Sequence, residues 1–180
     1  MTKKEFMNAV ANGKKDVLQI LIDAVNGIGA EYCVVGGLAV NAHTEPVVSL
    51  DLDLVVSASH LRAVCDAVAG HFTIKRFPHR VHLISADSDL RIRLQTDARY
   101  QAFLATAAMA NVLGYRLRVA SRENVLRGKL WAYGDRQRRT SKRQKDLADI
   151  LRLVEAHPEL AAGLPAAIHR KMKQAHLRRT

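Results

Sequence analysis

The chain has 180 residues, of which 48% are hydrophobic and 25% charged, the balance of an ordinary globular protein with one core. No apolar run approaches the length of a bilayer span, and the N-terminus lacks the apolar segment of a signal peptide. We therefore expect a cytoplasmic protein in which Cys33 and Cys65 are free buried thiols. The 28 Lys and Arg against 17 acidic residues give a net charge of +11, which favours a polyanionic partner and argues against a cationic substrate.

Hydrophobic periodicity predicts an α+β chain, with strands in the first two thirds and helices after them. The predicted strands are 32–35, 51–56, 72–77, 81–85, 90–95 and 116–119. The predicted helices are 16–28, 38–42, 57–69 (capped by Ser57 or Ser59), 101–110, one after Ser121 that bears Lys129, 140–156 (opened by Thr140 or Ser141) and one from Pro165. We expect an α/β core over 1–120 and a C-terminal helical part over 121–180, packed together as one compact unit.

A double glycine follows the first predicted strand. Gly36 and Gly37 lack side chains, so the chain can turn tightly there and bring backbone N–H groups close to a ligand. A helix that begins beyond them directs free N–H donors and a partial positive charge at an anion. The pattern predicts a phosphate cradle; the plainer interpretation is a turn alone.

Two carboxylates alternate with leucine on the next predicted strand. Side chains two residues apart share a face, so Asp51 and Asp53 point the same way, with their α-carbons about 6.6 Å apart. Both can then reach one divalent cation, Mg²⁺ or Mn²⁺, which removes the cost of two unpaired carboxylates on a buried strand. The alternative is an edge strand with two solvated aspartates. A cradle followed by this pair indicates a nucleoside triphosphate held for phosphoryl or nucleotidyl transfer.

The order Gly36-Gly37, then Ser49-x-Asp51-x-Asp53, resembles the opening motif of the DNA polymerase β-like nucleotidyltransferases. Within this superfamily the chain is most similar to the AbiEii/AbiGii toxin branch, which includes the MenT toxins. The resemblance implies a mixed twisted sheet with flanking helices and a C-terminal helical pack. It also implies Mg²⁺-dependent transfer of a nucleoside monophosphate from a triphosphate to an acceptor hydroxyl.

Two later motifs of the toxin branch also have counterparts. Segment 128–132, Gly-Lys-Leu-Trp-Ala, with Arg136 beyond it, resembles the lysine motif, and segment 143–150, Arg-Gln-Lys-Asp-Leu-Ala-Asp-Ile, resembles the closing Lys-Asp-x-x-Asp motif. The resemblance therefore covers residues 30–155. It implies an RNA acceptor, the tRNA 3′ end, and an antitoxin partner. The residues implied in binding the nucleotide are Gly36, Gly37, Ser49, Lys129 and Arg136, beside the metal ligands Asp51 and Asp53.

Helical geometry places the charged residues of these later motifs. At 100° per residue, Lys129 falls within an apolar arc, where it either extends to solvent or meets a buried anion such as phosphate. Asp146 lies beside the apolar stripe of its helix and is expected to enter a cleft, where it positions or activates the acceptor hydroxyl. Asp149 lies nearly opposite the stripe and is expected to anchor a lysine or arginine. Pairs four residues apart, with Lys142 and Lys145, are the plainer alternative for both aspartates.

Basic residues gather in two groups that suit a nucleic acid, because each neutralised phosphate releases a counterion. The first group is Arg136, Arg138, Arg139, Lys142, Arg143 and Lys145, of which the last five are predicted to bind RNA. The second group is Arg170, Lys171, Lys173, Arg178 and Arg179. The alternative is a basic surface that serves solubility only.

One feature departs from the superfamily. Many members carry a third catalytic carboxylate on a later strand, where this chain has Arg91 and Arg93. Asp89 or Asp97 at the strand ends could replace it, or the chain could use Asp146, so the general base stays open. The departure also leaves a catalytically degenerate fold that binds RNA or protein as the second interpretation. Transfer to a protein or antibiotic hydroxyl is a third.

Overall fold

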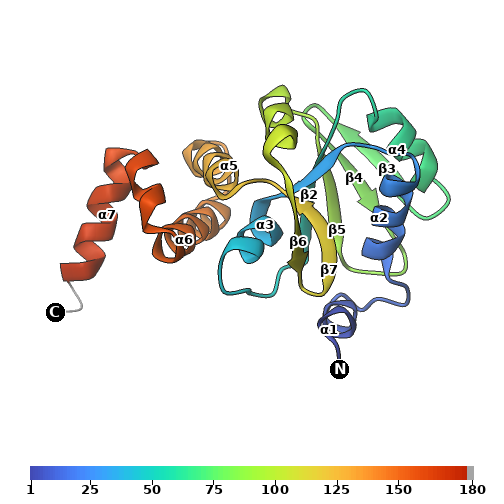
Figure 1. Cartoon of the computed structure of the whole chain (residues 1–180), viewed down its shortest axis with the longest axis horizontal. Coiled ribbons are helices and arrows are strands. Elements are labelled where there is room, and N and C mark those ends of the chain that lie inside the picture. Colours follow the sequence, from blue (N-terminus) through green and yellow to red (C-terminus); the bar gives the residue numbers. More distant parts are fainter. Residues whose placement is uncertain (178–180) are drawn as a thin grey trace. The chain divides into compact units, whose positions relative to one another are not determined.

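A computed structural model describes residues 1–177, with side chains as far as residue 172 (Figure 1). The chain divides into two units, Met1–Val125 and a second from Leu126 onward, which are described separately. Within residues 1–177, the helices are too short or too polar to cross a membrane. Cys33 and Cys65 are free and buried, as the sequence predicts.

The first unit is built on one mixed seven-stranded sheet with the order β3-β4-β5-β2-β1-β7-β6. The strands are β1 (Tyr32–Val35), β2 (Asp51–Val56), β3 (Thr73–Phe77), β4 (Arg80–Ile84), β5 (Arg91–Gln95), β6 (Ala108–Val112) and β7 (Tyr115–Val119). Strand β2 is central: it pairs antiparallel with β1 and parallel with β5. Its alternating sequence buries Leu52 and Leu54 completely and turns the aspartates to the opposite face.

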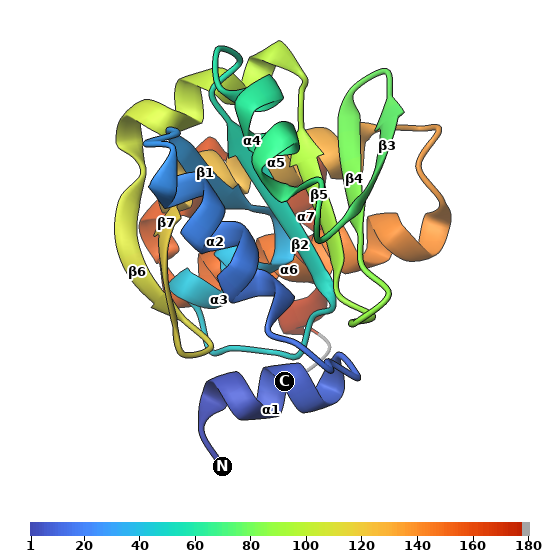
Figure 2. The ribbon, with the colours of Figure 1, turned by 90° about the vertical axis from the view of Figure 1, so that its right-hand side faces the viewer.

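Helices cover the sheet unequally. They are α1 (Lys3–Val10), α2 (Val17–Gly27), α3 (Gly36–His43), α4 (Leu61–Val68) and a 3₁₀ helix, η1 (Ala98–Thr106). Helices α2 and α4 lie on one face of the sheet and α3 on the other, as the two views show (Figures 1 and 2). Asp16 caps α2 by accepting a hydrogen bond from the Gln19 N–H at 3.0 Å, and it also accepts one from the Tyr115 hydroxyl at 3.0 Å. This cap therefore also ties α2 to β7.

The second unit is helical. It holds the greater part of α5 (Arg122–Gly134), then α6 (Thr140–Ala156), the 3₁₀ helix η2 (Pro158–Gly163) and α7 (Ala166–Leu177). Ile150, Leu153 and Val154 of α6 are buried at helical spacing and form its core stripe. Of the second predicted basic group, Arg178 and Arg179 lie outside the described residues, as does the Lys173 side chain.

The α+β class predicted from the sequence is confirmed, and the predicted strands agree with β1–β5 and β7 to within a residue or two. The helix predicted over 101–110 is wrong, because η1 ends at Thr106 and Ala108–Val112 forms edge strand β6. Its alanines favour a helix, but a two-residue turn at Leu113 and Gly114, both at positive φ, pairs this segment with β7. Tertiary pairing overrides local propensity here.

The predicted side-chain cap of α4 is also wrong. The residue before α4 is His60, without a side-chain cap, while the Ser57 and Ser59 hydroxyls bond each other at 2.7 Å. Helix α6 begins at Thr140 and ends at Ala156, as predicted, and Arg139 before it makes no side-chain cap. Helix α3 begins at Gly36 rather than at Leu38, which brings the double glycine into its first turn.

Candidate functional site

The turn from β1 into α3 places a helix N-terminus against β2. Gly36 has φ +70°, and a Cβ at this position would lie 2.6 Å from Oδ2 of Asp53. Glycine is therefore required twice, for the backbone conformation and for the close approach. Val35, the residue before the helix, pairs with Asp53 and offers no side-chain cap to the first N–H groups of α3. The first N–H groups of α3, which have no side-chain cap, therefore lie close to the Asp53 carboxylate.

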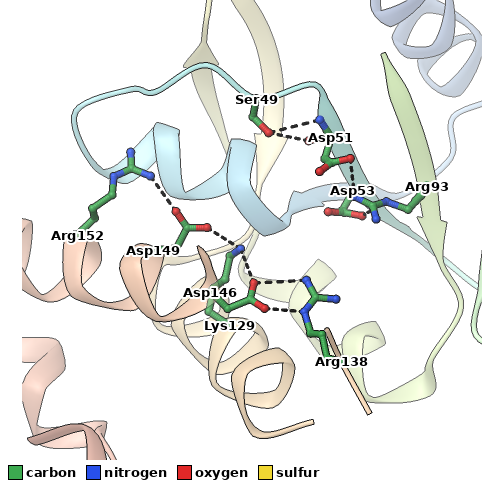
Figure 3. A network of polar contacts seen from close by, with 9 residues as sticks. All are labelled: Ser49, Asp51, Asp53, Arg93, Lys129, Arg138, Asp146, Asp149 and Arg152. Carbon is green, nitrogen blue, oxygen red and sulfur yellow. Dashed lines mark hydrogen bonds and ion pairs between the residues drawn. The ribbon is translucent and has the colours of Figure 1, made fainter. Parts of the chain in front are cut away.

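Asp51 and Asp53 lie on one face of β2, as their spacing predicts, and Arg93 of β5 contacts both (Figure 3). Arg91 donates from Nε to Oδ1 of Asp51 at 2.8 Å, and Nη2 of Arg93 lies 3.0 Å from the same oxygen. Nε of Arg93 lies 2.9 Å from Oδ1 of Asp53. Its N–H direction does not meet hydrogen-bond geometry, so we treat this contact as an ion pair. The parallel register sets Asp51 beside Arg91 and Asp53 beside Arg93.

The sequence prediction was that only a metal ion would compensate the two carboxylates. In the structure the arginines of β5 do so. The neighbouring strand supplies the counter-charge, at the position where the superfamily often has a third carboxylate. The Arg93 side chain is 24% exposed and that of Arg91 is 64% exposed, so solvent reaches both partners. Ser49 is buried, and its hydroxyl accepts a hydrogen bond from the Asp51 N–H at 3.3 Å, which fixes the start of β2.

The two carboxylates fit a divalent cation. The Arg93 guanidinium contacts both, through Nη2 and Nε, so the two carboxylates face one positively charged group. Within residues 1–177 there is no cluster of three or more His, Cys, Asp or Glu side chains suited to a metal. The protein's donor set is therefore a pair of carboxylates, and Mg²⁺ commonly completes such a pair with substrate phosphates and water.

A pocket of about 420 Å³ is lined by residues of β4 and β5, among them the arginines that contact the aspartates, and no sequence motif predicted it. Its lining includes His82, Ile84, Ser85, Ser88, Arg91 and Arg93. His82 pairs in register with Arg93 across β4 and β5. Burial, followed by the charges of Arg80 and Arg93, lowers the pKa of His82, so its ring is neutral at pH 7. The alternation of basic and apolar residues in β4 and β5 was the available signal for this surface.

The second unit holds its own charged cluster, between α5 and α6. The Lys129 ammonium lies 3.1 Å from Oδ1 of Asp146 and 2.7 Å from Oδ2 of Asp149 (Figure 3). The three side chains are 8%, 2% and 5% exposed. Lys129 thus lies in the apolar arc that the helical geometry predicts, and the buried anion that it meets is the aspartate pair of α6.

Arginines bind the outer sides of both aspartates. Nε of Arg138 donates to Oδ2 of Asp146 at 2.6 Å, and Arg152 donates to Oδ1 of Asp149 at 2.9 Å. Asp149 therefore anchors a lysine and an arginine, although it is buried rather than on the solvent side of α6. Both carboxylate oxygens of Asp146 are occupied.

The five residues predicted to bind RNA differ in their surroundings. Arg138 is held by Asp146, while Arg143 donates from Nε to the Tyr133 carbonyl at 2.9 Å and lies over the Tyr133 ring. Arg139 and Lys145 are exposed, Lys142 is half-buried, and the predicted phosphate ligand Arg136 is exposed. Arg138 and Arg143 thus make side-chain contacts within their own unit.

The architecture is that of the nucleotidyltransferases, and solved structures of this class share it at low sequence identity. No protein-family model and no curated protein sequence matches the chain. At these identities the likeness shows a shared fold, and membership of the DNA polymerase β-like superfamily stays a prediction. Membership of the toxin branch stays a prediction.

Three of these structures span most of the chain. ANT(2″)-Ia in complex with adenylyl-2″-tobramycin has a TM-score of 0.61 and 14% identity, covering 87% of this chain and 97% of its own. The lincosamide antibiotic adenylyltransferase LnuA, bound to lincomycin, has a TM-score of 0.56 and 15% identity, covering 79% and 99%. An antigenic nucleotidyltransferase-like protein from Paracoccidioides brasiliensis has a TM-score of 0.53 and 20% identity, covering 83% and 75%.

Proposed function

We propose that the protein is a nucleotidyltransferase that moves a nucleoside monophosphate from a triphosphate to an acceptor hydroxyl and releases pyrophosphate. One observation carries this proposal. The uncapped N-terminus of α3 meets Asp53 across Gly36, and Asp51 lies on the same face of β2. Phosphate oxygens and a divalent cation are the ligands that such donors and such carboxylates bind together.

Asp51 and Asp53 would hold Mg²⁺ or Mn²⁺, which when bound neutralises phosphate charge and orients the triphosphate. The backbone N–H groups at Gly36 and Gly37 bind the phosphates from the other side, and Ser49 keeps Asp51 in place. Arg93 competes with a metal ion for the carboxylates, since its guanidinium contacts both. Once free of them, Arg91 and Arg93 have the planar donor geometry that suits phosphate oxygens.

Lys129, Arg136 and Asp146 take part as the resemblance implies, the first two on phosphate and the third on the acceptor hydroxyl. Lys129 is held between two carboxylates, which fixes the direction of its ammonium group. Arg138 occupies Oδ2 of Asp146 and Lys129 occupies Oδ1, so an acceptor hydroxyl reaches Asp146 only after one of them moves away.

The proposed acceptor is RNA, at the 3′ end of tRNA, in a toxin–antitoxin pair. The resemblance to the toxin branch and the net charge of +11 support this acceptor. The second candidate is transfer to an antibiotic, because adenylyltransferases with lincomycin and tobramycin ligands share the fold. The net charge favours RNA over any cationic antibiotic, which the protein would repel.

The test is incubation with each labelled nucleoside triphosphate, Mg²⁺ and total tRNA, beside the same reaction with an Asp51→Asn variant. Label on RNA from the wild-type protein alone supports the proposal. Label that enters only protein or a small molecule rejects the RNA acceptor but keeps the transferase. If the biological effect of the protein survives Asp51→Asn while metal binding is lost, the protein is a degenerate binding module.

A further inference from the structure

The sheet of the first unit has one open region, formed by β3, β4 and β5. Alternate residues of these strands, among them Val81, Leu83 and Ile92, are buried in the core. The residues between them are exposed or half-buried. Because paired residues of neighbouring strands share a face, the register identifies the members of this surface. The open face consists of Thr73, Lys75, Phe77, Arg80, His82, Ile84, Arg91, Arg93 and Gln95.

The open face combines positive charge with exposed apolar groups. The three strands contain no acidic residue. Phe77 is 44% exposed and Ile84 is 42% exposed, although both are large and hydrophobic. Solubility alone would not require exposed apolar side chains on a basic surface. A single-stranded nucleic acid has both phosphates and flat apolar bases, so it fits both features of the open face.

The exposed Phe77 ring has an aromatic neighbour and a cationic neighbour. Its ring centroid lies 4.6 Å from that of His82, and the Arg80 guanidinium lies 5.7 Å from it. His82 is neutral at pH 7, since burial and neighbouring cations lower its pKa, so it supports the ring without adding charge. An aromatic group with a cation beside it is the usual arrangement for stacking a base of a single strand.

The open face leads to the carboxylate pair. Lys75, His82 and Arg93 lie side by side across three strands, and Asp53 is the next residue of this row. The pocket of about 420 Å³ lies at the same end, with His82, Arg91 and Arg93 in its lining. This volume is within the range of pockets that hold small ligands, and a nucleoside is such a ligand.

We propose that the open face of β3–β5 binds a single-stranded nucleic acid, with a base stacked on Phe77 and the terminal nucleoside in the pocket beside Arg91 and Arg93. This inference rests on the proposed transferase function and names the surface that its acceptor occupies. It differs from the sequence prediction, which placed RNA on the basic residues 138–145. Arg138 and Arg143 already have partners in their own unit, whereas Lys75 and Arg80 are exposed.

The first test measures binding without catalysis. Fluorescence anisotropy with a labelled single strand of about 12 nucleotides, without nucleoside triphosphate, gives the affinity and its salt dependence. Phe77→Ala should weaken binding roughly 5- to 100-fold because it removes the stacking platform, while Phe77→Trp should keep the affinity. Lys75→Ala with Arg80→Ala should lower the salt slope by about 0.7 for each phosphate that the protein no longer neutralises.

Matched controls use similar residues outside the open face. Met109 of β6 is exposed to a similar degree as Phe77, so Met109→Ala removes apolar surface alone. Lys3→Ala with Arg62→Ala removes two exposed cations from α1 and α4. Neither control should change the affinity more than about twofold, a range we attribute to the small change in net charge.

The outcomes separate the surface from the function. A duplex that binds as tightly as the single strand, unchanged affinity in Phe77→Ala, or preferential binding of an acidic polypeptide overturns the inference. Equal affinity for RNA and DNA strands supports a general single-strand surface, and a preference for RNA identifies the natural ligand. Strand binding without any transfer activity supports the surface and refutes the proposed function. Transfer to a small molecule without strand binding supports the transferase function and refutes the proposed surface.

Discussion

The two carboxylate pairs of the molecule are built alike and differ in their access to solvent. Asp51 and Asp53 share one arginine of the neighbouring strand, and Asp146 and Asp149 share one lysine of the neighbouring helix. Solvent reaches the Arg93 bridge, whereas Lys129 and its aspartates are almost completely buried. A solvated bridge can exchange its cation at little cost, but a buried one cannot.

Because the two pairs differ in exposure to solvent, we expect them to have different roles. Breaking a buried ion pair leaves an uncompensated charge, so the α5–α6 cluster stabilises its unit and orients its own side chains. Solvent reaches the β2 pair through its partners Arg91 and Arg93, so this pair should contribute less to stability than the α5–α6 cluster. Metal binding should therefore be more sensitive to the first pair in the chain, and stability to the second.

Asp51→Asn should have the largest effect on activity. It removes one of two carboxylates available for a metal, and metal-ion stabilisation of several kcal/mol corresponds to a factor of about 10³ in rate. Transfer of labelled nucleotide measures this decrease. The thermal midpoint should fall only slightly, because Asn keeps the shape of the buried Asp51 side chain and the partners Arg91 and Arg93 are partly exposed to solvent. A large fall in midpoint would show that the β2 pair is structural as well.

Lys129→Met should have the largest effect on stability. The change keeps the length of the side chain but leaves Asp146 and Asp149 without their shared cation, at a cost of about 3–5 kcal/mol. Urea denaturation measures it. Lys145→Met on α6 is the control, since this lysine is exposed and should change stability by less than about 1 kcal/mol. Equal stabilities of the two variants would remove the distinction between the pairs.

Gly36→Ala tests whether the backbone positions the β2 pair. Positive φ costs an alanine about 1–2 kcal/mol, and the new Cβ would press on Oδ2 of Asp53. We expect a matching loss of stability together with weaker nucleotide binding, measured by denaturation and calorimetry. Gly27→Ala, at the end of α2 with open space around it, should be neutral or slightly stabilising. If Gly36→Ala binds nucleotide as tightly as the wild-type protein, the predicted phosphate cradle at Gly36 and Gly37 is wrong.

Periodicity sufficed to predict that Asp51 and Asp53 share a face, because the side-chain alternation of a strand is local. It also placed Lys129 in an apolar arc. Periodicity could not predict the partners of these residues. Arg93 meets the aspartates only because β5 lies beside β2 in parallel register, and Lys129 meets α6 through the packing of two helices. Strand order and helix contact are long-range properties that one sequence does not encode in any short pattern.

The same limit explains why the open face of β3–β5 was not anticipated. The strands themselves were predicted, and their basic residues were visible, but which residues form one row depends on the register of three pairings. A cluster of arginines contiguous in sequence, as in 136–145, is easier to see. Contiguity in sequence is a poor guide to a binding surface, because Arg138 and Arg143 of that cluster serve contacts inside their unit.

Arg93→Ala should produce the smallest of these effects and the most informative one for the comparison. Without the guanidinium that contacts both aspartates, the β2 pair should bind Mn²⁺ about tenfold more tightly, a change of about 1.4 kcal/mol. Electron paramagnetic resonance of free Mn²⁺ measures this without any turnover. Arg91→Ala is the matched control and should change the affinity less, since Arg91 contacts only Asp51 and is largely exposed. Weaker Mn²⁺ binding in Arg93→Ala would show that the arginine supports the metal site, and the β2 pair would then resemble the buried pair in depending on its own cation.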